Sequence, residues 1–412
     1  MSRIDAGEAV IRAHREEWAR IVASLTRRFG DLDIAEESAA EAFAIALERW
    51  PTDGVPPNPG AWLTTTANRK AIDRIRREAR RDAKHQEAQM LYDDGPPEPL
   101  GVIDDDRLRL IFTCCHPALA MEARVALTLR MVAGLTVPEI ARAFLVQESA
   151  MGQRITRAKG KIKAARVPYR VPSAADLPAR VSGVLAVIYL VFNEGYLTTS
   201  SDTDPVRSDL TAEAIRLTRL IRLLIPGDGE VTGLLALMLL AEARRQARVS
   251  KAGALIPLYD QDRRSWDAEL IAEGHALVRE RLATGVAPGR YQILAAISAV
   301  HTSAPDARDT DWSQVVALYD QLISLDPSPI VALNRAVAVA ELDGPEVGLA
   351  AIGGLDDHLS GYHAYHATRA DFLRRLGRTE ESRSAYDRAI GLTGNSAEIA
   401  HLTRRRDELP LG

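Results

Sequence analysis

The segment from Leu135 to Ile162 reads LTVPEIARAFLVQESAMGQRITRAKGKI and decides the fold of this chain. Thr136, followed three residues later by Glu139, is the pattern of a capping box at a helix start. A second helix is predicted from about Glu148. Its apolar side chains recur at helical spacing and are Met151, Ile155, Ala158 and Ile162. The segment therefore predicts two short helices joined by a tight turn.

The opposite face of the predicted second helix is polar and cationic. Its side chains are Ser149, Gln153, Thr156, Arg157 and Lys163, flanked by Arg154, Lys159 and Lys161. A helix with one apolar and one cationic side fits the major groove of DNA. An ordinary amphipathic hairpin with a solvated basic face shows the same pattern, so the segment alone leaves both interpretations open.

Composition favours an all-α protein. Hydrophobic residues make up 46% of the 412 residues and aromatic residues only 5%, and β-branched runs are short. The longest apolar run, Val181 to Phe192, is too short to span a bilayer. The only cysteines, Cys114 and Cys115, are adjacent and provide no disulfide framework. With no recognisable signal peptide, these features predict a cytoplasmic protein without a membrane partner.

Charge is distributed unevenly along the chain, although the net charge is only −4. Residues 1–170 carry 27 Lys and Arg against 24 Asp and Glu, whereas residues 171–412 carry 25 against 32. The basic residues of the first part gather in Arg69–Lys84 and Glu148–Arg166. Two such clusters indicate two surfaces that face phosphates, or two solvated helix faces.

The pattern divides into four segments. Residues 8–80 are predicted to form a helical domain, and residues 81–105 a polar linker. Residues 106–166 form a second small helical domain that ends in the helix-turn-helix, and residues 176–412 read as helix after helix. Within the last segment, YDQLISL at 319–325 returns as YDRAIGL 67 residues later, close to two periods of 34. This period is typical of tetratricopeptide repeats, with a generic helical bundle as the alternative.

Residues 31–50 contain six acidic residues and one basic residue. Asp33 is predicted as the N-cap of this helix. Because its acidic side chains lie away from the apolar side, the helix suits a basic protein surface, or simply a solvated face. A proline-rich loop over 51–59 follows, and Pro59 is predicted to begin the next helix. Trp62 lies on the arginine-rich side of that helix, where it would stack on an unpaired base, or else belongs to the core.

Catalytic and metal-binding patterns are absent from the sequence. No phosphate-binding loop, zinc-protease or nucleophile-elbow motif occurs, and no cofactor is predicted. Cys114, Cys115 and His116 are consecutive and cannot converge on one zinc ion, so a structural role is predicted. His363 and His366 lie one helical turn apart, and a packed repeat helix is preferred over a ligand site.

Together these motifs resemble the extracytoplasmic-function sigma factors of RNA polymerase. The resemblance rests on the segment Leu135–Ile162 and on a second set of residues, which are Trp62, Leu63, Asn68, Asp73, Arg76 and Arg77. Val181–Leu197 and the repeats after it resemble the subgroup with a C-terminal tetratricopeptide-like extension. A free-standing DNA-binding regulator and an enzyme housed in 176–412 are the alternatives. The acidic helix and the Trp62–Arg77 motif favour the sigma factor, because a repressor has no use for DNA-melting residues.

The resemblance implies specific roles. The residues implied to dock on the core polymerase, through its β′ and β subunits, are Asp33, Glu36, Glu37 and Glu41. The residues implied to bind and melt the −10 promoter element are Trp62, Asn68, Arg69, Asp73, Arg76 and Arg77. The residues implied to read the −35 element are Ser149, Gln153, Arg154, Thr156, Arg157, Lys159 and Lys161. The C-terminal repeats are expected to contact a protein or the sigma domains themselves.

Overall fold

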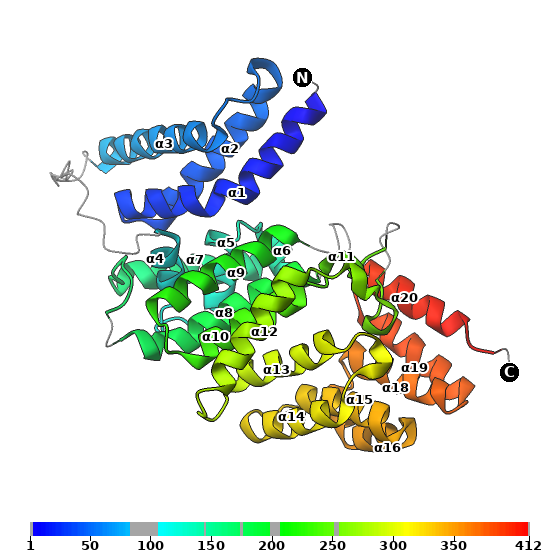
Figure 1. Ribbon diagram of the computed structural model, residues 1–412. Helices are drawn as coiled ribbons and strands as arrows, with labels where there is room; N and C mark the ends of the chain where they lie inside the picture. Colours follow the sequence, from blue (N-terminus) through cyan, green and yellow to red (C-terminus); the bar gives the residue numbers. More distant parts are fainter. Residues whose placement is uncertain are drawn as a thin grey trace. The chain divides into compact units, whose positions relative to one another are not determined.

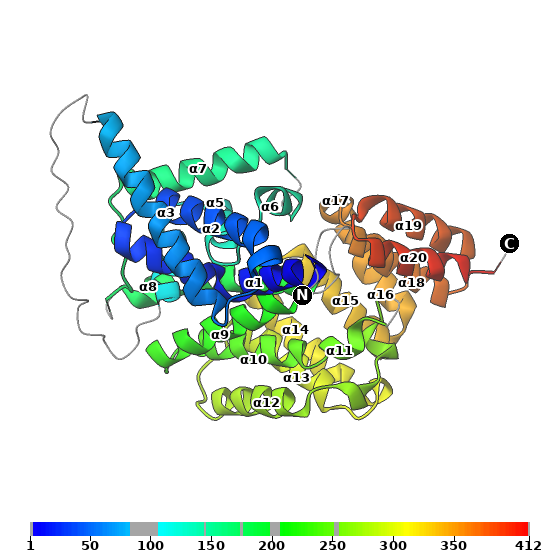
Figure 2. The ribbon, with the colours of Figure 1, turned by 90° about the horizontal axis from the view of Figure 1, so that it is seen from above.

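The fold is helical throughout the part of the chain that the structure describes (Figures 1 and 2). The computed structural model describes residues 3–82, 106–143, 146–173, 176–197, 207–250 and 255–410. In these ranges the only β-pairing is an isolated bridge between Val249 and Leu255. The predicted all-α class is therefore confirmed. The predicted linker 81–105 lies almost entirely outside the described residues.

Two compact units make up the chain, residues 1–191 and residues 192–412. The first unit begins with α1 (Arg3–Phe29), α2 (Leu32–Asp53) and α3 (Pro59–Asp82). These three helices pack on one another. The residues that α2 buries between its neighbours are mostly small and include Ala35, Ala39, Ala42 and Ala46. Small side chains let the helices approach closely, and they leave the acidic residues on the remaining faces of α2.

Two details of α2 differ from the prediction. The N-cap is Asp31 and not Asp33, because the Asp31 backbone is extended and its carboxylate accepts from the backbone N–H groups of Asp33 (2.8 Å) and Ile34 (3.2 Å). The helix also continues through Pro51 and ends before Gly54, whose φ of 85° suits glycine. Pro51 has no N–H to donate to the Leu47 carbonyl, and the helix ends two residues later. The predicted start of α3 at Pro59 is confirmed.

The second half of the first unit contains the helix-turn-helix. Its helices are α4 (Asp106–Cys114), α5 (Met121–Met131), α6 (Val137–Ala143) and α7 (Glu148–Ala164), followed by α8 (Leu177–Tyr196). The predicted capping box is present: the Thr136 N–H donates to the Glu139 carboxylate (2.7 Å), and the Glu139 N–H donates to the Thr136 hydroxyl (3.4 Å). The apolar stripe of α7 is buried as predicted, and α7 packs on α5 and α6.

The boundary between the two compact units falls inside α8, at Val191. The predicted start of the C-terminal domain at residue 176 stays a prediction. The second unit continues with α9 (Ser208–Leu224), α10 (Gly229–Glu242), α11 (Arg245–Arg248), α12 (Ala268–Leu282) and α13 (Arg290–Ser303). Helix α10 is buried from Val231 to Ala241 and packs on α9, α12 and α13. Gly233 permits this packing, because a Cβ at this position would lie 2.6 Å from the backbone nitrogen of Gln292.

The last part of the second unit consists of paired helices. They are α14 (Trp312–Leu325), α15 (Pro329–Asp343), α16 (Pro345–Ile352), α17 (Asp356–Leu359), α18 (His363–Arg375), α19 (Thr379–Leu392) and α20 (Ser396–Asp407). Short 3₁₀ turns lie at Leu258–Asp260, Arg263–Ser265, Ala307–Asp309 and Gly353–Leu355. The helices α14, α16 and α19 begin at 312, 345 and 379, which matches the predicted period near 34. The tetratricopeptide assignment itself stays a prediction.

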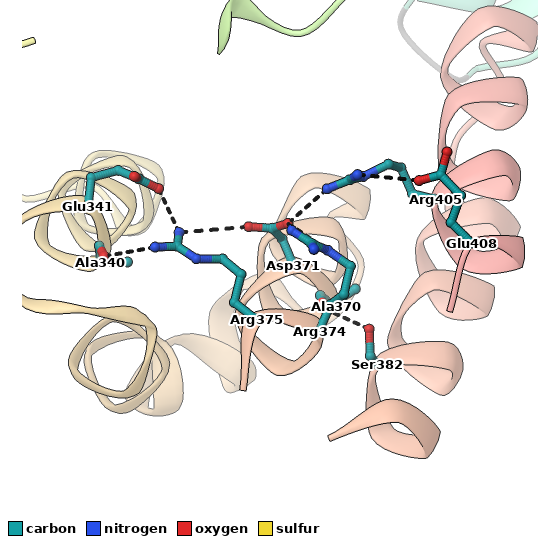
Figure 3. A network of polar contacts seen from close by, with 9 residues as sticks. All are labelled: Ala340, Glu341, Ala370, Asp371, Arg374, Arg375, Ser382, Arg405 and Glu408. Atoms are coloured by element: carbon teal, nitrogen blue, oxygen red, sulfur yellow. Dashed lines mark hydrogen bonds and ion pairs between the residues drawn. The ribbon is translucent and has the colours of Figure 1, made fainter. Parts of the chain in front are cut away.

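Polar contacts hold neighbouring helix pairs together. Figure 3 shows Asp371 of α18 at the centre of such a network. Its carboxylate accepts from Arg374 (2.7 Å) and from Arg405 of α20 (3.4 Å). Arg375 reaches in the other direction and donates to Glu341 of α15 (2.6 Å). The arginines of this network therefore each have a carboxylate partner.

Candidate nucleic-acid and protein-binding surfaces

Helix α7 presents most of its predicted DNA-reading residues to solvent. The exposed ones are Ser149, Gln153, Thr156, Arg157 and Lys161, and Arg154 is half-buried. The Arg157 guanidinium donates to the Gln153 side-chain oxygen (3.3 Å) one turn earlier, which orients both side chains along the helix. This surface is polar and cationic, as the sequence predicted.

Lys159 is the exception on α7, because it turns toward the acidic start of α2. Its ammonium lies 2.8 Å from an oxygen of Asp33 and also contacts the carboxylate of Glu36. Lys163 lies 2.7 Å from Asp31 in the same way. From α5, Arg130 donates to Glu36 at 2.6 Å. The structure thus joins Lys159 of the predicted −35 set with Asp33 and Glu36 of the predicted core-docking set.

We call this cluster the α2–α7 ion-pair network; its members are Asp31, Asp33, Glu36, Arg130, Lys159 and Lys163. Burial by itself raises the pKa of Glu36, but the charges of Lys159 and Arg130 outweigh it, and the pKa is lowered below 4.5. Burial likewise lowers the pKa of Lys159, and the carboxylates of Glu36 and Asp33 more than reverse this effect. Both groups are therefore charged at neutral pH. The sequence contained each charge but no signal for their pairing.

The other predicted docking carboxylates of α2 face α3. Glu37 pairs with Arg74, and Glu41 lies 3.3 Å from Lys70. The Glu37 and Glu41 side chains remain 48% and 43% exposed, whereas Glu36 is only 11% exposed. An incoming basic surface can therefore reach Glu37 and Glu41 directly, but it can reach Glu36 only if the α2–α7 ion-pair network opens.

Helix α3 exposes a second cationic surface. Its exposed predicted residues are Arg69, Asp73, Arg76 and Arg77. Asn68 is half-buried; its amide donates to the Thr64 carbonyl (3.0 Å), and its side-chain oxygen accepts from Arg28 (3.4 Å). Trp62 is also half-buried, with its ring edge-to-face against Trp50 at 5.7 Å between centroids. Trp62 is thus anchored on one side by the core while the other side remains accessible.

The residues of the two minor candidate sites lie in different surroundings. Cys114 and Cys115 are buried, and burial raises the pKa of the Cys115 thiol to about 12. No group of His, Cys, Asp and Glu in the described ranges could hold a metal ion. His366 is buried and hydrogen-bonded to the Ser360 carbonyl (2.8 Å), as a packed repeat helix predicts. His363, by contrast, lines a cavity of the second unit.

Comparisons with known proteins agree with these two surfaces. Residues 10–81 match the family Sigma-70 region 2, and residues 109–162 match Sigma-70, region 4. Residues 180–282 match a family of unknown function, DUF6596. No solved structure matches the chain.

Two relatives extend this result. An uncharacterised protein of Rhizobium meliloti is 45% identical over 392 residues, which cover 94% of this chain and 92% of that protein. The ECF RNA polymerase sigma factor SigK of Mycobacterium ulcerans is 27% identical over 143 residues, which cover 33% of this chain and 74% of that protein.

These matches fall on the two helical modules that carry the α3 and α7 surfaces, and they define the class: a transcription initiation factor whose partners are RNA polymerase core and promoter DNA. The chain carries the region 2 and region 4 domains of an extracytoplasmic-function sigma factor, followed by a C-terminal helical extension. None of its described helices has the length and apolar content needed to cross a bilayer.

Proposed function

We propose that this sigma factor binds core polymerase through α2, reads a −35 element with α7, and binds and melts a −10 element with α3. The observation that carries the proposal is that two separate modules each expose a cationic helical face, while an acidic helix lies beside them. Two DNA elements and one protein partner require three such surfaces.

The exposed face of α7 has the chemistry of direct base readout. Glutamine side chains form paired hydrogen bonds with adenine, and arginine side chains do so with guanine. Gln153 and Arg157 are held side by side on this face, one helical turn apart. Lys161 is exposed further along the helix and suits the phosphate backbone. We therefore assign base reading to Gln153 and Arg157 and phosphate contact to Lys161.

The surface of α3 has the chemistry of strand opening. Flipping a base out of the duplex costs a few kcal/mol. Stacking one base on an aromatic side chain returns about 1–3 kcal/mol. Trp62, fixed edge-to-face on Trp50, offers such a stacking surface, and Arg76 and Arg77 are exposed about four turns further along the same helix. We propose that Trp62 holds an unpaired base while the arginines bind the phosphates of the opened strand.

Core polymerase binding by Glu36 requires an exchange of partners. Glu36 is only 11% exposed and is engaged by Lys159, so a basic surface of the polymerase has to displace this lysine to reach it, whereas Asp33 is 47% exposed. The displacement also frees Lys159 for promoter DNA. We therefore propose that docking on the core opens the α2–α7 ion-pair network and couples polymerase binding to −35 recognition. The C-terminal extension is proposed to contact a protein or the sigma domains.

Promoter binding with and without core polymerase tests the proposal. A gel shift at physiological salt is expected to show sequence-specific binding only when core polymerase is present. Specific binding by the isolated chain would instead support a free-standing regulator.

Strand opening is tested separately on α3. The double variant Arg76→Ala, Arg77→Ala is expected to reduce permanganate reactivity at −10 more strongly than it reduces closed-complex formation. Lys70→Ala is the matched control, since Lys70 lies on the same helix but pairs with Glu41. Normal melting in the double variant would contradict the role given to the two arginines.

A further inference from the structure

The second unit contains a cavity of about 390 Å³ that the proposed promoter functions do not use. One side is formed by the end of α8, by α11 and by the segment Leu255–Gln261. The other side is formed by α18 and α20, with His363, Glu398 and Leu402. Small-molecule sites typically have volumes of roughly 300–1,000 Å³, so this cavity has the size for a small ligand.

Two arginines line this cavity, and the described part of the chain places no carboxylate within ion-pair distance of either. Arg248 is only 5% exposed, donates one N–H to the Tyr196 carbonyl, and lies over the Tyr196 ring. Its Nη1 atom is buried and has no hydrogen-bond partner. Arg244 donates to the Tyr196 hydroxyl (3.2 Å), and its buried Nε atom is also unpartnered. Two guanidinium groups in one cavity with open donors form a site for an anion.

Among the described residues, nearby carboxylates compensate these arginines only in part: the charge of Glu242 acts on Arg248, but its ion pair is with another arginine. Glu242 lies 2.7 Å from Arg245. Glu398 is occupied by the Thr393 hydroxyl (2.5 Å) and by His363 (3.4 Å). The arginines of the Asp371 network in Figure 3, by contrast, each have a carboxylate partner.

A buried charge without a partner is costly. Burial is the main cause that lowers the pKa of Arg248, and the charge of Arg244 adds to it. Since buried charged groups in proteins are nearly always paired, the open donors of Arg248 and Arg244 favour the binding of an anion.

The other groups that line the cavity indicate which kind of anion fits it. The Gln261 side-chain amide donates to the Ile256 carbonyl (3.0 Å), which leaves its buried oxygen without a donor. A ligand hydroxyl would supply that donor. The remaining wall is largely apolar and includes Ala364, Ala367 and Leu402. This combination places donors for an anionic group beside an acceptor for a hydroxyl and an apolar wall, and it therefore favours an organic anion.

We propose that this cavity binds a small hydroxylated organic anion, whose carboxylate or phosphate group lies between Arg244 and Arg248. The hydroxyl donates to Gln261, and the carbon skeleton lies against α18 and α20. The cavity would make the C-terminal extension a sensor of a small metabolite. The inference does not depend on the proposed promoter contacts, because binding is measured on the sigma factor alone.

Calorimetric titration of the full-length chain tests the proposal. The probes are sodium phosphate, sodium acetate and sodium lactate, each at constant ionic strength adjusted with sodium chloride, and glucose is the uncharged control. We expect saturable binding of at least one oxyanion and none of glucose. Comparing the affinities of acetate and lactate with that of phosphate shows whether the site prefers a carboxylate or a phosphate group. Comparing lactate with acetate shows whether a hydroxyl group strengthens binding, as expected from its hydrogen bond to Gln261.

Three variants decide whether the binding occurs at this cavity. Arg248→Met is expected to weaken binding at least about tenfold, because it removes a charge-assisted contact. Ala364→Trp fills the cavity without changing either arginine and is expected to abolish binding. Arg219→Met, at a surface arginine that pairs with Glu273 (2.7 Å), is the matched control and should bind normally.

Absence of saturable binding for all three anions would overturn the proposal. So would undiminished binding by Arg248→Met. If Arg248→Met fails to fold by circular dichroism, the outcome is decided by Ala364→Trp, and undiminished binding there overturns the proposal equally.

Discussion

Replacing Glu36 by glutamine tests the α2–α7 ion-pair network most directly. The substitution keeps the shape of the side chain but removes its charge, between Arg130 at 2.6 Å and Lys159. Breaking a buried ion pair by neutralising one partner costs about 3–5 kcal/mol. In the variant, Arg130 still donates to the Leu135 carbonyl (2.8 Å) and Lys159 still pairs with Asp33 (2.8 Å). We therefore expect a loss of stability at the lower end of this range. We predict that Glu36→Gln lowers the unfolding free energy of the first unit by about 3 kcal/mol.

The matched control is Glu37→Gln, one residue further along the same helix. Glu37 is 48% exposed, and its partner Arg74 is 30% exposed. Exposed pairs contribute about 0–1 kcal/mol, so this variant is expected to change stability little. Urea unfolding, followed by hydrogen-exchange mass spectrometry of peptides from α2 and α7, measures both variants locally. A loss of less than about 1 kcal/mol in Glu36→Gln would refute the reasoning.

The pH dependence supplies an independent check. The pKa of Glu36 is lowered in the folded chain, so its ion pairs stabilise the fold above the unfolded pKa of about 4.3. This contribution is lost as the pH falls through the lower, folded pKa. The difference in stability between the wild type and Glu36→Gln should therefore shrink below about pH 4. A difference that stays constant into strong acid would mean that charge is not its origin.

Three further substitutions or measurements follow from the structure. Gly134→Ala should lower the unfolding free energy of the first unit by about 2 kcal/mol in urea unfolding, because the φ of Gly134 is +71° and the new Cβ would lie 2.9 Å from Trp18. Gly160→Ala is the control. It should not destabilise the fold, because there is open space around Gly160. Burial lowers the pKa of His301 to about 4, so protonation of this side chain favours the unfolded state. The unfolding free energy of the second unit should therefore fall by about 3 kcal/mol between pH 6.5 and pH 4, and His301→Gln should remove this loss. Equal dependence of stability on pH in the wild type and the variant would contradict this prediction. The Cys115 thiol, with its pKa raised to about 12, should react with a thiol reagent only as fast as the protein unfolds; rapid labelling of the native chain would show that it is accessible.

The local features of this protein were readable from its sequence. The capping box at Thr136, the buried stripe of α7 and the helix start at Pro59 depend on residues within one or two turns of one another. The all-α class follows from many such local preferences. The near-34 spacing of the helix starts at 312, 345 and 379 was also visible, because YDQLISL at 319–325 returns as YDRAIGL 67 residues later. The N-cap was misassigned because Asp31 and Asp33 offer the same carboxylate, and only the extended backbone at Asp31 distinguishes them.

Only the tertiary structure decided which charged groups meet. Lys159 and Glu36 are 123 positions apart, and each reads by itself as part of a solvated helix face. Arg248 and Glu398 border one cavity from positions 150 residues apart, and no local pattern marks either as part of a site. Helical periodicity determines which side of a helix is polar. The partner of that side depends on how distant helices pack, and the free energy of a charge depends on that partner and on its burial.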